Sequence, residues 1–239
     1  MTTTTGRRYL AFDIETAKVL PREAENLFDH RPLGVACVAA FASDSDEVTT
    51  WHGHTETGSP APKMSPAEVR ALLADLAGFV ADGYTLATWN GAGFEFDILA
   101  EESGDRALSI ELATDHVDMM FHVLCSRGYY ISLQKAALGM SLAGKLEGVS
   151  GAEAPAMWAR GEYDRVLEYN VQDARLTAEL AVAGDEARRL RWITRRGSPA
   201  TMPLPEGWLS VRHAMELPLP DNSWMTDPPS REDLIGWMG

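Results

Sequence analysis

The chain has 239 residues, of which 45% are hydrophobic and 23% charged, the composition of an ordinary globular domain with a sizeable core. Its formal net charge of −14 argues against a protein that coats or stores nucleic acid, because such proteins carry an excess of basic residues. Any nucleic acid would have to be held locally, through metal ions and a confined basic patch.

The cysteines and the apolar runs narrow the class further. Cys37 and Cys125 are isolated from each other, which indicates neither a disulfide framework nor a zinc site. The longest apolar run, residues 33–42, is too short to span a bilayer, so we expect no contact with membranes. The stretch MTTTTGRR lacks the apolar centre of a signal peptide and predicts a cytoplasmic location.

The first predicted elements are strands. Residues 7–16, RRYLAFDIET, alternate with the period of a strand. Its apolar members share one face and its acidic members the other: Leu10, Phe12 and Ile14 against Asp13 and Glu15. Two more strands are expected at 34–42 and 47–53, joined by a turn at 43–46.

Helices dominate the rest of the predicted domain. Residues 65–83 predict a helix with a capping box, in which Ser65 is the N-cap and Glu68 reaches back to it. A short strand at 84–89 ends at an Asn-Gly turn. Further helices are expected over 94–103, 118–127, 132–139 and 162–192. This order favours an α/β class, a mixed sheet flanked by helices.

The composition changes at residue 197, where proline becomes frequent. We expect residues 1–196 to form one domain and residues 197–239 to form an irregular Pro/Trp-rich C-terminal tail packed on it. The expected anchors are three large apolar side chains that favour burial: Trp208, Trp224 and Trp237. Such a tail could also receive a protein partner.

Two pairs of polar residues are placed by secondary structure to act together. Asp13 and Glu15 are two apart on a strand, so both leave the same face, roughly 6–7 Å apart. Tyr169 and Asp173 are four apart on a helix and lie on one side of it. An aspartate on a mainly apolar face needs a partner or a metal ion. The alternatives are a solvated strand face and a Tyr–Asp pair with a salt bridge to a nearby arginine, Arg165 or Arg175.

A third motif lies between these pairs, in TWNGAGFEFDILAEES (88–103). Asn90-Gly91 allows a sharp turn from strand to helix. A carboxylate on the first helical turn would then lie at the carboxyl edge of the sheet, close to where Asp13 and Glu15 are expected.

Taken together, FDIET (12–16), WNGAGFE (89–95) and YNVQD (169–173) resemble the three motifs of the DEDD superfamily of 3′–5′ exonucleases. The tyrosine branch, which includes the proofreading domains of family B DNA polymerases, is the more similar one. The histidine branch would place His at position 168, which is Glu168 here. GYYISLQKAALGM (128–140) also resembles the segment that precedes the third motif.

The resemblance implies a ribonuclease-H-like fold and a metal-dependent 3′–5′ exonuclease acting on 3′ ends of DNA or RNA. It implies two divalent ions, Mg²⁺ or Mn²⁺, held by four carboxylates: Asp13, Glu15, Glu95 and Asp173. Converging carboxylates raise one another's pKa unless cations compensate them, and oxygen ligands suit these hard ions. Two such ions can stabilise both the attacking water and the leaving 3′-oxygen. The resemblance assigns Tyr169 to positioning the water or phosphate, and we assign Asn90 and Thr16 to substrate binding.

The second motif departs from the family pattern, in which an Asp directly follows the aromatic residue. Glu95 occupies that place, and Asp97 is the alternative ligand, turned by about 200° on the helix. Glu101 and Glu102 are expected on the solvated face. A longer acid at this position predicts a slow enzyme that prefers Mn²⁺, because Mg²⁺ demands near-octahedral geometry.

Because Glu95 departs from the Asp of the family pattern, other functions are also considered. One is a catalytically weak relative that serves as a nucleic-acid-binding or protein-interaction module, and another is an endonuclease of the same fold. Five arginines around Trp192, in EARRLRWITRRG (186–197), could bind a backbone or stack a base, or could simply be a solvated helix end. His52 and His54 are expected on the surface, and Asp118 in a supporting role behind the site.

Overall fold

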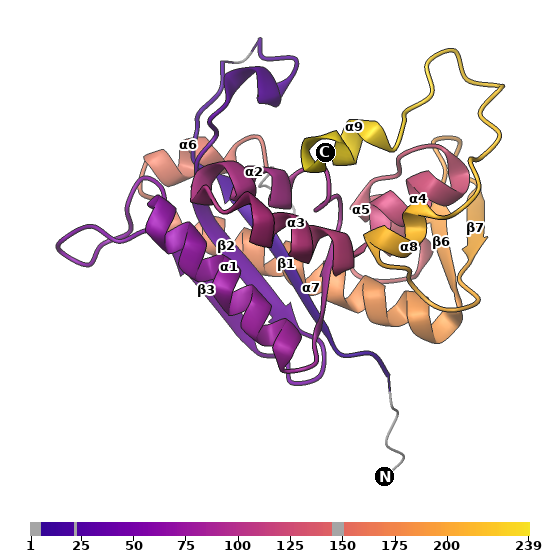
Figure 1. Ribbon diagram of the computed structural model, residues 1–239, viewed down its shortest axis with the longest axis horizontal. Helices are drawn as coiled ribbons and strands as arrows, with labels where there is room; N and C mark the ends of the chain where they lie inside the picture. Colours follow the sequence, from indigo (N-terminus) through magenta and orange to yellow (C-terminus); the bar gives the residue numbers. More distant parts are fainter. Residues whose placement is uncertain (1–5, 22, 145–150) are drawn as a thin grey trace.

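The computed structural model describes residues 6–21, 23–144 and 151–239, so the first five residues of the MTTTTGRR stretch lie outside the described part. A five-stranded sheet forms the centre of the molecule, in the order β3-β2-β1-β4-β5 (Figure 1). Its strands are β1 (Tyr9–Thr16), β2 (Val35–Ala42), β3 (Val48–His52), β4 (Thr85–Thr88) and β5 (Val117–Asp118). β1 pairs antiparallel with β2 and parallel with β4, which makes the sheet mixed. The predicted α/β class is confirmed.

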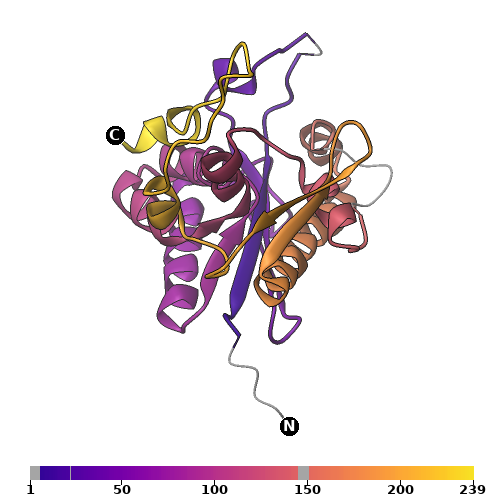
Figure 2. The ribbon, with the colours of Figure 1, turned by 90° about the vertical axis from the view of Figure 1, so that its right-hand side faces the viewer.

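Helices cover both faces of the sheet, and the alternation of β1 decides which residues meet which helices (Figure 2). The apolar residues Leu10, Phe12 and Ile14 pack into a core shared with three helices on one face: α1 (Pro66–Ala81), α2 (Glu95–Ser103) and α3 (Arg106–Asp115). Tyr9 and Ala11 point to the other face, into a core shared with the long helix α7 (Tyr163–Ala187). The face that carries Asp13 and Glu15 is therefore covered by α7.

The predicted helices of the first 140 residues are confirmed, with small shifts at their ends. They are α1 and α2 together with α4 (Met119–Arg127) and α5 (Leu133–Gly139). The capping box forms as predicted, because Ser65 accepts from the Glu68 N–H and Glu68 accepts from the Ser65 N–H at 2.7 Å. Among the described helices before α7, three were not predicted: η1 (Leu27–His30), α3 and α6 (Ala154–Ala159).

The predicted end of the long helix is wrong. α7 stops at Ala187, and Arg188 adopts a left-handed conformation with φ of 52°. The chain then enters a hairpin of β6 (Arg189–Ile193) and β7 (Pro199–Pro203). Leu190 and Trp192 alternate with exposed arginines, which is the period of a strand. Because Trp192 is buried, it cannot stack a base from solvent; only the arginines remain accessible.

Two of the three tryptophans expected to anchor the tail are buried or half-buried. Trp208 is fully buried and donates a hydrogen bond to the Ala181 carbonyl at 3.0 Å, and Trp237 is half-buried. Trp224 is 68% exposed, so its predicted burial is wrong; its ring packs edge-to-face against Tyr129, with ring centroids 6.3 Å apart. Beyond β7, the segment forms α8 (Val211–Met215), α9 (Glu232–Ile235) and η2 (Gly236–Met238). Within the described ranges, none of the helices has the length and apolar character needed to cross a membrane.

Candidate active site

The first pair of predicted site residues lies on β1, beneath α7. Asp13 accepts a hydrogen bond from the side-chain amide of Asn170 at 2.7 Å, which joins the central strand to the helix. Glu15 is buried and lies opposite Cys37 of β2. Burial raises the pKa of the Cys37 thiol, and the negative charges of Glu15 and Asp13 raise it further. The two carboxylates therefore lie on the same side of the sheet, both close to Cys37.

The loop between β4 and α2 sets where the second motif begins. Asn90 adopts φ of 87°, and its N–H and that of Ala92 donate to the Asp118 carboxylate at 3.0 and 2.9 Å. The Gly91 N–H donates to the Thr88 hydroxyl at 2.9 Å, and a Cβ at Gly91 would lie 2.3 Å from that oxygen. Only glycine fits there. Asp118 thus has the supporting position that the sequence predicts for it.

This loop delivers Glu95 as the first residue of α2, in a buried position. Burial raises the pKa of its carboxyl well above the usual value, and the charges of Asp13, Asp118 and Glu15 add to the effect. Among the described residues, Oε2 of Glu95 has no hydrogen-bond partner. A buried carboxylate in this state is costly unless a proton or a cation neutralises it.

The third motif faces the same space from α7. Tyr169 and Asp173 are both buried on the helix face that covers β1. Burial raises the pKa of the Tyr169 hydroxyl, as do the charges of Asp173, Glu15 and Asp13 and a hydrogen bond with Asp173. All five predicted catalytic residues are therefore brought together. Asn170, which the sequence analysis missed, adds the bond to Asp13; its place beside Tyr169 in the third motif was the available signal.

The arginines considered as salt-bridge partners of the third motif have other contacts. Arg165 donates to Glu162 at 2.6 Å, and the Arg175 guanidinium lies 4.3 Å from the centre of the Phe41 ring.

The other carboxylates of the opening motif have protein partners. Asp97 forms an ion pair with Arg31, and Arg31 also lies 3.2 Å from Glu101, which is exposed. Glu102 is buried, so its predicted place on the solvated face is wrong. It accepts a hydrogen bond from the Gly34 N–H at 2.7 Å, because the segment before β2 folds over the end of α2.

The residues assigned to substrate binding lie at the rim of this site. Thr16 is half-buried at the end of β1, directly after a register shift in the pairing with β2. Asn90 is half-buried in the loop, and its side-chain oxygen accepts no hydrogen bond from the described residues.

The residue types of this site are those that bind hard divalent cations. Over residues 6–21, 23–144 and 151–239, no three His, Cys, Asp or Glu side chains are grouped to hold a metal ion. The chemistry of the carboxylates fits nevertheless, because their oxygens match Mg²⁺ or Mn²⁺. The Glu95 carboxyl, one oxygen of which has no hydrogen-bond partner among the described residues, lies close to the charges of Asp13, Asp118 and Glu15.

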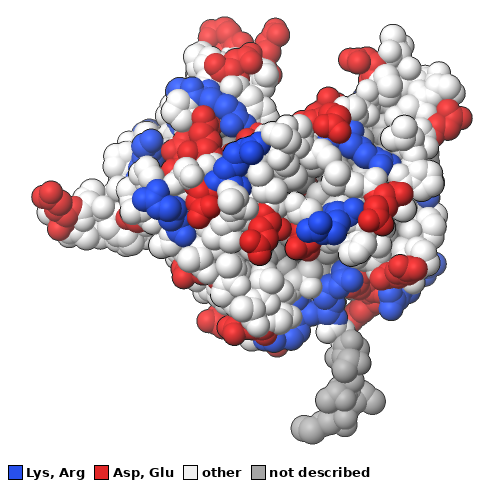
Figure 3. Space-filling view, viewed as in Figure 1, with Lys and Arg blue, Asp and Glu red and all other residues white. Residues whose placement is uncertain are grey.

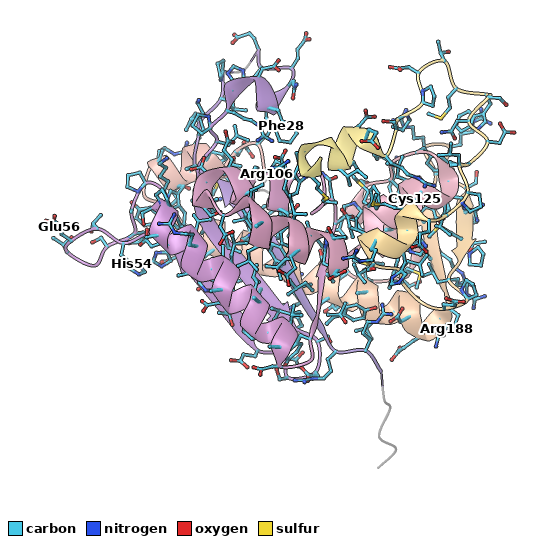
Figure 4. The ribbon with its side chains drawn as sticks, in the orientation of Figure 1. Phe28, His54, Glu56, Arg106, Cys125 and Arg188 are labelled. Atoms are coloured by element: carbon cyan, nitrogen blue, oxygen red, sulfur yellow. The ribbon has the colours of Figure 1, made fainter. Side chains whose placement is uncertain are left out.

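On one face of the molecule, the charged side chains do not mark a single binding surface (Figure 3). On the face shown in Figure 3, acidic and basic residues are interspersed. His54 is exposed on the loop that follows β3, and His52 is partly buried beside it, with ring centroids 4.4 Å apart (Figure 4). The predicted surface position holds for His54.

A five-stranded mixed sheet flanked by helices is the arrangement of the ribonuclease-H-like class of α/β proteins. Here β1, α2 and α7 present acids to one space. The family model described as the RNase_H superfamily matches residues 10–183, well over half of the chain. The chain belongs to this superfamily. Nucleases of this fold generally use divalent metal ions, and the fold implies contact with nucleic acid.

A solved structure supports the same fold. The chain is similar to the family B DNA polymerase from the hyperthermophilic archaeon Pyrobaculum calidifontis, with 20% sequence identity and a TM-score of 0.52. The match covers 74% of this chain and 24% of that chain, so this chain spans about a quarter of the polymerase. At this identity the likeness concerns the fold alone. No curated protein matches the sequence.

Proposed function

We propose that the protein is a metal-dependent 3′–5′ exonuclease of the tyrosine branch of the DEDD superfamily, which hydrolyses phosphodiester bonds at the ends of single-stranded DNA or RNA. The observation that carries the proposal is the convergence of three motifs, far apart in sequence, on one buried acidic space. Glu95 of α2 faces Asp13 and Glu15 of β1, and Tyr169 of α7 faces the same two acids and Asp173.

In this proposal the carboxylates of Asp13, Glu15, Glu95 and Asp173 hold two divalent ions, Mg²⁺ or Mn²⁺. When bound, such ions neutralise the acidic cluster, increase the acidity of a water molecule and stabilise charge on the leaving 3′-oxygen. The metal ions would contact the phosphate in place of lysine or arginine side chains. This agrees with the net negative charge of the chain.

Tyr169 would act as a hydrogen-bond donor to the attacking water or the phosphate. Its raised pKa keeps the hydroxyl protonated at neutral pH, so it cannot serve as a general base. Asn170 would hold Asp13 in place through its amide. Asn90 and Thr16, at the rim of the site, would contact the last nucleotides of the strand.

A second candidate is a catalytically weak relative that binds nucleic acid without degrading it. Two observations favour it: the Glu at position 95 in place of the family's Asp, and the lack of three acids grouped for a metal ion in the described part of the chain. A cytoplasmic location remains part of the proposal, as does a catalytic domain over 1–196 with a tail over 197–239. The exposed Trp224 is where the tail would receive a protein partner.

The test is digestion of 5′-labelled single strands of DNA and RNA with Mg²⁺ or Mn²⁺, using Asp13→Ala as the control. We expect a ladder of products shortened from the 3′ end, which a phosphorothioate at the 3′-terminal linkage blocks. Cleavage of circular single strands would indicate an endonuclease. Binding of the strand without any digestion by the wild type would favour the second candidate.

A further inference from the structure

The segment of residues 230–239 lies outside the part of the chain that the family model matches, yet it packs on the loop that precedes α2. In Figure 1, α9 lies beside α2. Leu234 and Ile235 are buried in a cluster that also contains Ala92 and Cys125. A Cβ at Gly93 would lie 2.4 Å from the Leu234 side chain, so the loop and the segment are in close contact.

Ala92 is held from two sides. Its N–H donates to Asp118 of β5 at 2.9 Å, and its carbonyl accepts a hydrogen bond from the indole N–H of Trp237 at 2.6 Å. The first bond lies within the superfamily domain. The second comes from a residue 145 positions away, in a part of the chain that the family model does not include.

The segment is itself fixed at both ends. Arg106, at the start of α3, donates to the carbonyls of Trp237 and Gly239, the latter at 2.8 Å (Figure 4). Arg231 donates to the carbonyls of Met215 and Leu217 at 2.6 and 2.7 Å. Trp237 therefore restrains Ala92 from an anchored position.

Glu95 follows Ala92 by three residues and opens α2, and its N-cap, Phe94, makes no side-chain capping bond. The start of the helix is thus set by the loop and not by its own cap. We propose that Trp237 is a positioning residue: its hydrogen bond to Ala92 fixes the loop and, through it, the carboxylate of Glu95. Residues 230–239 would then complete the acidic site. This inference rests on the proposed exonuclease function.

The experiment uses Trp237→Phe, which removes the indole N–H and keeps an aromatic ring in the contact. Mn²⁺ binding is titrated without substrate by the loss of the free-ion electron paramagnetic resonance signal. kcat and KM are then measured on a single-stranded oligonucleotide. We expect Mn²⁺ affinity and kcat to fall by roughly 3–10-fold, the factor that one hydrogen bond supports, with KM nearly unchanged. Trp51→Phe is the matched control, because it also removes an indole N–H, one that donates to Asp75 of α1 at 2.8 Å, and it should change neither quantity.

Arg106→Gln is the second variant, because it loosens the segment without touching the buried cluster. We expect it to lower Mn²⁺ affinity and kcat in the same ratio, and to add little in the Trp237→Phe background. Wild-type affinity and kcat in both variants would overturn the inference, even if their melting temperatures fall, because a purely structural contact affects only stability. A wild-type protein that neither binds Mn²⁺ nor shortens strands would instead overturn the proposed function.

Discussion

Each end of α2 carries a buried glutamate. The two side chains differ in whether their carboxylate oxygens have partners. Glu95 and Glu102 are seven residues apart, close to two helical turns, so both lie on nearly the same side of the helix. Glu102 accepts a hydrogen bond from Gly34 at 2.7 Å and lies 3.6 Å from the Lys63 ammonium. Glu95 has an oxygen with no hydrogen-bond partner among the described residues, and its carboxyl lies close to the charge of Asp13.

Both glutamates are buried, so burial alone does not distinguish a structural carboxylate from a candidate catalytic one. The hydrogen-bond and ion-pair partners of each carboxylate do distinguish them. Glu102 ties the segment before β2 to the end of the helix, and its charge is compensated by the fold itself. Glu95 lies among like charges that raise its pKa, which is a state typical of functional sites. The following predictions test this contrast, from the largest expected effect to the smallest.

The strongest test removes the acids that Glu95 faces. Asp13→Ala, Asp173→Ala and the double variant should each lower the rate of strand shortening on the order of 10⁴-fold or more, with the double variant no worse than the singles. The reason is that groups sharing one site lose function together. Rates are measured on labelled oligonucleotides, with circular dichroism to confirm folding. Near wild-type activity of Asp13→Ala would contradict the site.

The second test treats the two glutamates alike. Glu95→Gln should lower activity about 10³-fold and raise the melting temperature, because it removes a buried charge beside Asp13. Glu102→Gln should leave activity unchanged and lower stability by about 1 kcal/mol, because its bond to Gly34 loses its charge. Thermal unfolding and oligonucleotide digestion measure both. Melting temperatures that shift in the same direction would remove the contrast.

The third test concerns the neutral partner of the acids. Tyr169→Phe should lower kcat by roughly 10–1000-fold while leaving Mn²⁺ affinity close to wild type, because the hydroxyl positions a reactant and does not bind the ion. A metal titration alongside the kinetics separates the two effects. If the Mn²⁺ affinity falls as far as kcat does, Tyr169 takes part in metal binding and does not only position a reactant.

The fourth test uses a buried histidine whose charged form is disfavoured by burial. His116 contacts the Thr88 hydroxyl and the Ala113 carbonyl at 2.9 and 2.6 Å, and burial lowers its pKa from 6.5 to about 4. Below pH 6.5 the unfolded chain takes up a proton that the folded chain does not bind until about pH 4. The free energy of unfolding should therefore fall as the pH falls through this range, by up to about 3 kcal/mol.

Urea unfolding between pH 7 and 4.5 measures this loss. His116→Gln should flatten the pH dependence, and His54→Gln, at an exposed histidine, should not. Equal slopes in the two variants would exclude His116 as the source.

The smallest expected change concerns the length of the acid at position 95. Glu95→Asp shortens the side chain by one methylene, roughly 1.5 Å, and should raise the rate with Mg²⁺ several-fold relative to Mn²⁺, because Mg²⁺ tolerates displaced ligands poorly. Asp97→Asn is the control, since its carboxylate pairs with Arg31 outside the acidic space. A dead Asp97→Asn beside an active Glu95→Ala would reverse the assignment of the second motif.

The sequence predicts the sheet and most helices of the first 140 residues because their apolar periods are strong and their turns carry local signals. α3 was missed because it buries only Ser109, Leu112 and Ala113, too few for a clear period. The end of α7 was missed because arginines favour helices as well as exposed strand positions, and only the pairing with β7 decides between them.

In the candidate site, too, local patterns could be predicted from the sequence and long-range contacts could not. Spacing within each motif selects Asp13, Glu15, Glu95, Tyr169 and Asp173, and their roles in metal binding stay predictions. Contacts between distant parts could not be predicted: Gly34 reaches Glu102 across 68 positions, and Asn170 reaches Asp13 across 157. A burial pattern shows which residues are covered, but not which ones cover them. The burial of Glu102 was missed because the segment that covers it, around Gly34, is distant in the sequence.

The position of Cys37 opposite Glu15 has a consequence for measuring how the molecule opens. Alkylating reagents attack thiolates, and the raised pKa of Cys37 keeps it as an unreactive thiol in the closed structure. Cys125, whose pKa burial raises to about 12, is equally protected in the cluster beneath residues 234 and 235. The alkylation rates of the two cysteines therefore report two separate local openings. Cys37 reports opening of the sheet beside the acidic space, and Cys125 reports release of residues 234 and 235. Neither measurement needs an engineered cysteine.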